Sequence, residues 1–185
     1  MLPRASQACA LILLSLGPFG LAHENAEAQP IRLVRDINPG LSSNMQKFTV
    51  VGDRLFFIAN DGVHGLEIWS SDGTSQGTQL VRDIQAGPTG LVPSNLLIWN
   101  GLLHFSQGEL WSSDGTNVGT TVLADINPGD PDSLPASLTL LDNIFLFVAD
   151  DGIHGRELWK SDGTSAGTMM VADLEPGSTG SGQAA

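Results

Sequence analysis

The sequence predicts an all-β fold of tandem four-stranded antiparallel blades, a partial β-propeller of three blades preceded by one leading strand. A string of the form Glu-Leu/Ile-Trp-x-Ser-Asp-Gly-Thr begins at Glu67 and recurs 42 residues later at Glu109 and another 48 later at Glu157. Such a recurring string is typical of repeat architectures. Short apolar runs separated by turn residues surround each copy, and no stretch keeps a helical period.

Residues 1–28 have the features of a secretory signal peptide. A positively charged start is followed by a short apolar core at residues 8–16, and cleavage is expected after Ala28 or Ala22. Cys9, the single cysteine of the sequence, would leave with this segment. We therefore expect a secreted or cell-surface protein without disulfides or thiolate chemistry, and without a membrane span after cleavage.

The remaining residues 29–185 are strongly acidic. These 157 residues carry 7 basic and 18 acidic side chains, a net charge of −11. Nucleic acids and anionic membranes require a basic surface, so neither is expected as a partner. The repeat domain is expected to span residues 29–177, and the Gly- and Ser-rich residues 178–185 are expected to form a flexible tail.

The first repeat shows how each blade is expected to form. Apolar runs predict strands at residues 47–51, 54–59, 66–70 and 79–84, with Gly52-Asp53 as a hairpin turn. The same unit recurs, giving repeats of about 41–87, 88–129 and 130–177.

Residues 31–37 match the fourth strand of every repeat, which predicts the leading strand. A leading strand of this kind completes the last blade of a closed propeller, but here the last repeat already has a fourth strand of its own. Propellers have about 4–8 blades, so we expect either that this chain is a fragment of a longer propeller or that copies of it associate to complete the ring.

The second repeat lacks a loop. Phe105 and Glu109 are 4 residues apart, whereas the corresponding residues of the first and third repeats are 9 apart. A tight Gln107-Gly108 turn replaces an Asp-Gly-x-His-Gly loop. A loop that can be lost is peripheral to the fold, so where it is kept it becomes a candidate for function.

The Glu-Leu-Trp, Ser-Asp-Gly-Thr, Gly-Thr and Val-x-Asp-Ile-x-Pro-Gly elements resemble, in order, the ELWxxDGT repeat family of secreted bacterial proteins. The resemblance covers essentially all of residues 29–185, with Ile68 in place of Leu in the first copy. It implies an exported, propeller-like repeat protein and names no activity. The Ser-Asp-Gly-Thr turn also looks like the Asp-box of sialidase propellers, a structural element that does not imply hydrolysis.

We expect the repeated residues to be structural. The tryptophans would anchor packing between sheets, the glutamates would be buried acceptors, and the Asp-Gly pairs would form turns. Paired acid and base catalysis by the glutamates is the alternative, but three copies disagree with a single active site. The set comprises Glu67, Trp69, Asp72, Gly73, Glu109, Trp111, Asp114, Gly115, Glu157, Trp159, Asp162 and Gly163.

Less repetitive side chains are candidates for ligand binding. Propeller topology would gather them on one rim, because its second and fourth loops emerge on the same face. The candidate ligand-binding residues are Asp61, His64, Asp150, Asp151 and His154, with Asn60 beside them. Oxygen ligands suit Ca²⁺, for which the candidates are Asp130, Asp132, Asp150 and Asp151. The alternative to a Ca²⁺ site is an acidic rim that only contacts solvent. A zinc site formed by His64 and His154 has less support, because zinc takes three or four ligands.

No common catalytic motif is present in the sequence. We therefore expect a non-catalytic module that binds or adheres to extracellular glycan or protein. The alternatives are a structural surface array without a small ligand, and a glycan-active hydrolase that would use Asp151 and His154.

Overall fold

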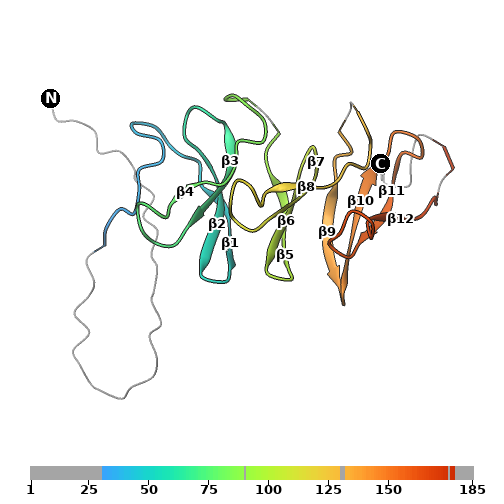
Figure 1. Cartoon of the computed structure of the whole chain (residues 1–185). Helices are drawn as coiled ribbons and strands as arrows, with labels where there is room; N and C mark the ends of the chain where they lie inside the picture. Colours follow the sequence, from blue (N-terminus) through green and yellow to red (C-terminus); the bar gives the residue numbers. More distant parts are fainter. Residues whose placement is uncertain (1–30, 90, 130–131, 175, 178–185) are drawn as a thin grey trace, which may run out of the picture.

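The structure is a computed structural model that describes residues 31–89, 91–129, 132–174 and 176–177. Within these residues it is all-β, with three separate four-stranded sheets and no helix (Figure 1). The predicted signal peptide, the predicted tail and Asp130 lie outside the described residues.

Each sheet contains four consecutive strands in chain order, and all neighbouring strands are antiparallel. The first sheet contains β1 (Gln46–Val51), β2 (Arg54–Asn60), β3 (Leu66–Ser71) and β4 (Gln79–Leu80). The second sheet contains β5 (Ser94–Trp99), β6 (Leu102–Gln107), β7 (Glu109–Ser113) and β8 (Thr121–Ala124). The third sheet contains β9 (Ala136–Leu141), β10 (Ile144–Asp150), β11 (Arg156–Ser161) and β12 (Met169–Ala172).

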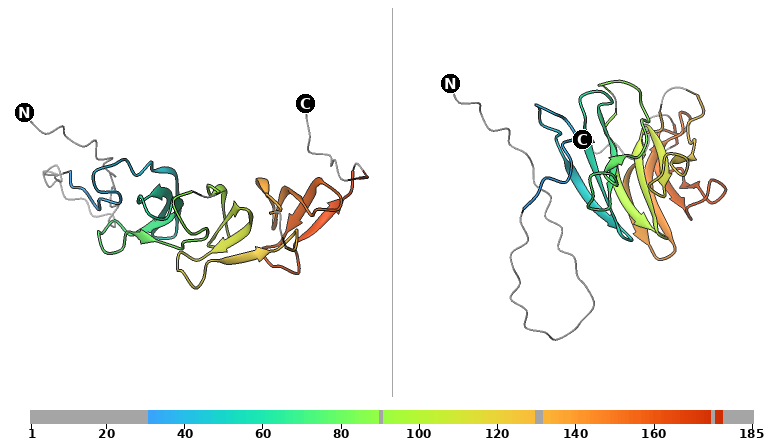
Figure 2. Two further views of the ribbon diagram at one scale, coloured as in Figure 1. Left: turned by 90° about the horizontal axis from the view of Figure 1, so that it is seen from above. Right: turned by 60° about the vertical axis from the view of Figure 1, so that its left-hand side comes forward.

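The three sheets stand in a row in chain order. Figures 1 and 2 show the first sheet at one end, the third at the other and the second between them. The β1–β2, β5–β6 and β9–β10 hairpins lie along the lower edge in Figure 1, and the connections between sheets run along the upper edge. The molecule is therefore an open row whose two ends differ.

Apolar side chains fill both junctions between sheets. The core of the first junction consists of Phe56, Ile58, Ile68, Val81, Leu103 and Phe105. The core of the second consists of Leu110, Ala124, Ile126, Phe145, Phe147 and Ala149. Burying a side chain of this size contributes about 1.5–3 kcal/mol, so these junctions hold the row together.

The Asp-Gly-Thr turn has the same hydrogen bonds in all three sheets. In the first, Asp72 Oδ1 accepts from the backbone N–H of Thr74 at 2.9 Å and from its hydroxyl at 2.7 Å. These bonds from the threonine hold the pKa of Asp72 below its ordinary value. Gly73 has a φ of 87°, which favours glycine at this point of the turn. Asp114 with Gly115 and Asp162 with Gly163 repeat the arrangement.

The predicted leading strand is wrong. Residues 31–36 form no strand, and the segment instead lies against the first sheet, where Ile37 is buried beside Phe57 and Trp69. Each fourth strand of a sheet pairs with the third strand of that same sheet. No strand of the described residues pairs with residues 31–37, so they keep the side-chain packing of a fourth strand without its ladder.

The fourth strand of the first sheet is shorter than residues 79–84. Only Gln79–Leu80 is strand, and one more backbone bond runs from Val81 N–H to the carbonyl of Ile68 at 2.9 Å. The Val81 side chain is 2% exposed and packs in the first junction. The chain leaves the ladder here because its apolar side chains are drawn into that junction.

Candidate functional site

The two retained loops are built alike. In the first sheet, Asp61 Oδ1 accepts from the backbone N–H groups of Val63 and His64, both at 2.9 Å, and Oδ2 lies 2.6 Å from His64 Nδ1. Asp151 makes the same bonds to Ile153 and His154 in the third sheet, with an Oδ2 to Nδ1 distance of 2.7 Å. The carboxylates thus act first as caps of their own loops.

Each pair shifts the pKa values of its members in opposite directions. The side-chain bond to Asp61 raises the pKa of His64, and Asp151 does the same for His154. Burial opposes ionisation of Asp61, but the hydrogen bonds from His64 and Val63 prevail and lower its pKa. The pKa of Asp151 is lowered in the same way. These shifts favour the carboxylate form of each aspartate and the protonated form of each histidine.

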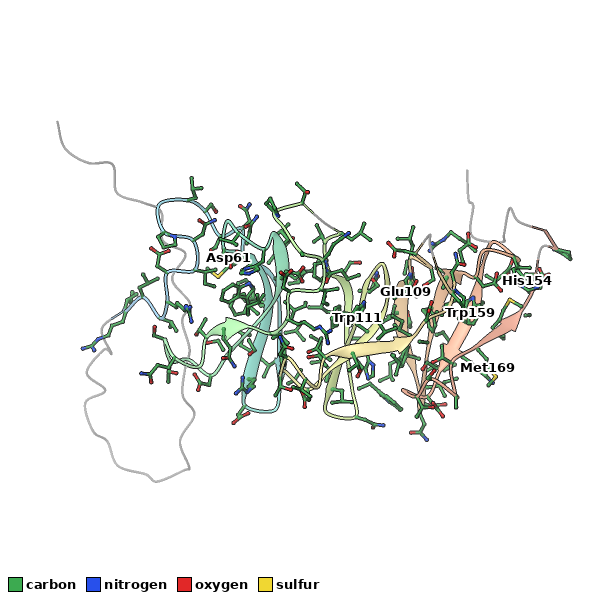
Figure 3. All side chains as sticks on the ribbon, turned by 45° about the horizontal axis from the view of Figure 1, so that its top comes forward. Asp61, Glu109, Trp111, His154, Trp159 and Met169 are labelled. Carbon is green, nitrogen blue, oxygen red and sulfur yellow. The ribbon has the colours of Figure 1, made fainter. Side chains whose placement is uncertain are left out.

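The structure does not bring the two loops together. Asp61 and His154 lie toward opposite ends of the row, with the second sheet between them (Figure 3). Asp150 Oδ1 and Asn60 Oδ1 accept from nearby glycine N–H groups, at 2.8 and 2.7 Å. Among the described residues, no three His, Cys, Asp or Glu side chains form a group that could hold a metal ion.

The second sheet differs because its loop is missing. Gly108 makes the turn between β6 and β7 with a φ of 71°, and a Cβ there would lie 2.8 Å from Oδ1 of Asp132. The Gly108 carbonyl accepts from Leu134 N–H at 2.8 Å. The turn is thus held against the connection to the third sheet, and its positive φ favours glycine.

Two adjoining cavities, of about 190 and 200 Å³, border this turn and share Leu91 and Gln107. We call them the rim hollow. The polar side chains in its wall include Asn95 and Ser106 on one side and Gln85, Glu109 and Asp132 on the other. In the first sheet, Gly65 of the retained loop lies against the carbonyls of Gly87 and Pro88, so the loop there covers the connection that follows its sheet.

Gln107 is the central polar residue of the rim hollow. Its side chain is 6% exposed, and Nε2 donates to Glu67 Oε1 at 3.1 Å. Gln107 Oε1 has no hydrogen-bond partner among the described residues. An amide oxygen left without a donor at a buried position carries a desolvation cost.

Trp111 lines the rim hollow without offering a free face. Its Nε1 donates to the carbonyl of Gln107 at 3.1 Å. One ring neighbour is Phe105, stacked at 6.4 Å between centroids, and another is the Arg82 guanidinium at 5.7 Å from the ring centre. Recognition in the hollow would therefore depend on hydrogen bonds more than on stacking.

The repeated glutamates each tie down the connection that leaves their sheet. Backbone N–H groups donate to Glu67 from Gln85 at 3.3 Å and to Glu109 from Ile126 at 3.4 Å. Leu174 N–H donates to Glu157 at 3.2 Å. Glu109 also accepts from the N–H and hydroxyl of Ser133. These carboxylates are anchors of the fold in the structure.

The repeated tryptophans lie in the packing between layers. Trp69 is 5% exposed and packs with the segment before the first sheet, and Trp159 packs against the core of the second junction. Sequence reasoning missed the rim hollow, although the short spacing between Phe105 and Glu109 was its signal. The prediction places the candidate residues in the two retained loops, whereas the rim hollow borders the turn where the loop is missing.

No family model matches the sequence. No curated protein matches it either. Among solved structures, the chain is similar to the computationally designed Ika8 protein, with 18% identity and a TM-score of 0.45 over 78% of this chain and 41% of that one. The chain thus spans about two fifths of the length of Ika8. The computationally designed Ika4 protein gives the same identity of 18% and TM-score of 0.45, over 80% of this chain and 82% of that one. In the described part of the chain, no helix is long and apolar enough to cross a membrane.

Proposed function

We propose that this chain is an exported, non-catalytic binding module with propeller-like repeats, and that its rim hollow recognises a hydroxyl-rich group such as the terminal sugar of a glycan. The observation that carries the proposal is the hollow itself, bordered by a turn that replaces the retained loop. The signal-like residues 1–28 and the resemblance to the ELWxxDGT repeat family support export. The three stacked sheets support propeller-like repeats.

The polar groups of the hollow favour a ligand that donates hydrogen bonds. Asp132 contributes a carboxylate and Gln85 an amide, both on exposed residues, and such groups commonly accept from sugar hydroxyls. Each cavity is smaller than the ~300–1,000 Å³ of pockets that enclose a drug-sized ligand. The hollow therefore suits one ring or one side chain at the end of a larger molecule.

The candidate carboxylates are already hydrogen-bonded within the fold, and this favours binding over glycan hydrolysis. Hydrolysis uses one carboxyl group to protonate the leaving oxygen and a second on the other side of the bond. At the hollow, Glu109 already accepts from three donors of the fold. Asp151, the alternative proposed for a hydrolase, is likewise engaged with His154 in another sheet.

The test is a glycan screen followed by calorimetry on every hit, with a variant that restores the missing loop. Inserting the five residues Asp-Gly-Val-His-Gly of the first sheet between Gln107 and Gly108 should fill the hollow and reduce affinity at least tenfold. Asp132→Asn should weaken binding less, because the amide keeps one acceptor. Asp61→Asn, in a distant loop, is the matched control.

Unchanged binding after loop insertion, in a variant that still unfolds cooperatively, would place the ligand elsewhere. Equal losses for Asp61→Asn and Asp132→Asn would also contradict the proposal. A screen without any hit, together with concentration-dependent assembly, would favour the structural array instead.

A further inference from the structure

The outer face of the third sheet is the one sheet face that no other element of the described chain covers. Leu146, Val148 and Leu158 are half-buried there. Their counterparts on the first sheet, Phe56, Ile58 and Ile68, are at most 1% exposed because the second sheet covers them.

The connection after the third sheet shows the same difference. Val171 is 48% exposed and Leu174 is 64% exposed. Val81, the counterpart of Val171 in the first sheet, is 2% exposed, and Ile126, the counterpart of Leu174 in the second, is 7% exposed. The other two counterparts, Leu123 and Ile84, are half-buried, so both positions are less exposed where another sheet follows.

The other end of the row holds the complementary element, residues 31–37, which we call the leading segment. Arg35 lies 5.9 Å from the ring centre of Trp69 and donates to the carbonyl of Thr78 at 2.5 Å. Arg82, which follows the fourth strand of the first sheet, makes the same two contacts with the second sheet, at 5.7 Å to Trp111 and 2.5 Å to the Thr120 carbonyl. The leading segment thus sits where the fourth strand of a preceding sheet would sit.

We propose that a second copy of this chain docks end to end on the outer face of the third sheet, with its leading segment replacing β12 at the sheet edge. The contact continues the two junctions already present within the chain. The first sheet of the second copy would cover Leu146, Val148 and Leu158, as the second sheet covers their counterparts. No new type of interface is required.

Only one of the two equivalent segments can pair with β11 at the edge of the third sheet, and the structure points to displacement of β12. The leading segment is held on its own first sheet by Arg35 and by Ile37, which is 8% exposed. All residues of β12 are exposed or half-buried. Exchange of equivalent segments between copies is a low-cost route to association.

The register of this exchange follows from the repeats. Met169 pairs with Lys160 across β11 and β12, and Arg32 occupies the position equivalent to Met169. Arg32 of the second copy would therefore face Lys160. Like charges opposite one another on neighbouring strands repel, so salt should strengthen the association.

The first test is the molar mass by light scattering over a range of concentrations. The wild-type mass should rise with concentration, and more steeply in 0.5 M than in 0.05 M NaCl, because the Debye length is about threefold shorter at the higher salt concentration. Leu33→Asp, at an exposed leading-segment position, should raise the concentration needed at least tenfold. Val118→Asp is the matched control, since this valine is exposed in the turn between β7 and β8. A wild-type monomer at about 1 mM, or equal behaviour of the two variants, would overturn the proposal.

The second test traps the register. In a Cys9→Ser background, chains carrying Arg32→Cys and Lys160→Cys are mixed and oxidised. Opposite residues of antiparallel strands have Cα atoms about 4.5–5.5 Å apart, within the range of a disulfide. A mixed disulfide should form at least tenfold faster than with Val118→Cys in place of Arg32→Cys. Equal rates, or links only between two Lys160→Cys chains, would mean that the end-to-end contact is absent.

Discussion

The side chain of Gln107 donates to Glu67 across the first junction, with 3.1 Å between Nε2 and Oε1. Both side chains are buried, at 6% and 1% exposure. Gln107 belongs to the turn that replaces the loop of the second sheet, and Glu67 anchors the connection leaving the first. The bond therefore links the rim hollow to the packing between sheets.

Gln107→Leu should destabilise the chain. The change removes the donor from Glu67 Oε1 and leaves that buried oxygen with the weaker bond from Gln85 N–H at 3.3 Å. Loss of a partner to a buried acceptor costs about 1–3 kcal/mol. Urea unfolding measures the difference, with Gln79→Leu at an exposed position of β4 as the control. Equal stability of Gln107→Leu and the wild type would show that water replaces the amide.

Glu67 should make stability fall as the pH rises. Burial raises the pKa of Glu67 from 4.5 to about 7 in the folded chain. Between these values the folded state binds a proton that the unfolded state has lost, so the free energy of unfolding decreases from pH 4.5 through about 7. Glu67 Oε2 has no hydrogen-bond partner in the described part of the chain, which adds to the cost of the charged form.

Glu67→Gln should remove this dependence and raise the free energy of unfolding by about 1–3 kcal/mol at pH 8. Glu109→Gln is the matched comparison in the second sheet, and it should destabilise. The Glu109 carboxylate accepts from Ile126 and Ser133, and an amide nitrogen cannot accept from those donors. Unfolding curves at several pH values measure both variants. A loss of stability in both would mean that Glu67 is needed as an anion.

His104 should have the opposite effect to Glu67, because it makes the free energy of unfolding fall as the pH falls. It is fully buried in the second sheet, with ring contacts to Trp99 and Phe145 at 6.0 and 5.1 Å. Burial lowers its pKa, and neither ring nitrogen has a hydrogen-bond partner among the described residues. The unfolded histidine gains a proton near pH 6.5, which the folded one resists, so this contribution to stability is lost as the pH falls below 6.5.

His104→Phe should stabilise the chain, by about 1 kcal/mol at pH 7 and by more at pH 5, because it removes a buried polar group and keeps the ring contacts. The first sheet has Phe56 at the equivalent position, buried in the first junction. His154→Phe is the control, since Asp151 raises the pKa of that histidine and its loss should matter most at low pH. A destabilised His104→Phe variant would indicate overpacking against Phe145, which His104→Leu would relieve.

The sequence was sufficient to predict the all-β repeats and the strands of each hairpin. Alternating apolar residues around Gly52 and the repeated Asp-Gly-Thr turns depend on local backbone chemistry, which composition reveals directly. The leading strand was predicted from similarity to the fourth strands, and that similarity is real in its packing. Its ladder was absent because pairing needs a neighbouring strand, which is a property of the whole row and not of residues 31–37.

The candidate site was harder to predict than the fold. Asp61 and His154 looked like parts of one rim because the loops share an edge, but the row is long enough to keep them apart (Figure 3). The rim hollow depends on a deletion near Gln107 and on the connection at Leu134, which lie in different repeats. Residue spacing within one repeat cannot reveal a cavity that forms between the connections of two repeats.

Gly119→Ala should destabilise the second sheet because a Cβ at this position would overlap the carboxylate of Asp114. That carboxylate accepts from Thr116 N–H at 2.8 Å and the Thr116 hydroxyl at 2.7 Å, while the hydroxyl accepts from Gly119 N–H at 2.9 Å. Displacing Asp114 would break at least two of these bonds, a cost of about 1–3 kcal/mol in this exposed turn. Thermal unfolding measures the loss.

Gly101→Ala is the control that distinguishes steric overlap of the added Cβ from backbone strain. Gly101 has a φ of 75° and nothing within 4 Å of a Cβ, so alanine there adds strain alone, about 1 kcal/mol. Asp114→Ala together with Gly119→Ala should cost less than the sum of the single changes, since the overlap exists only when both side chains are present. If the two losses were fully additive, the close approach of Asp114 to Gly119 would not be the reason for glycine in the Gly-Thr element.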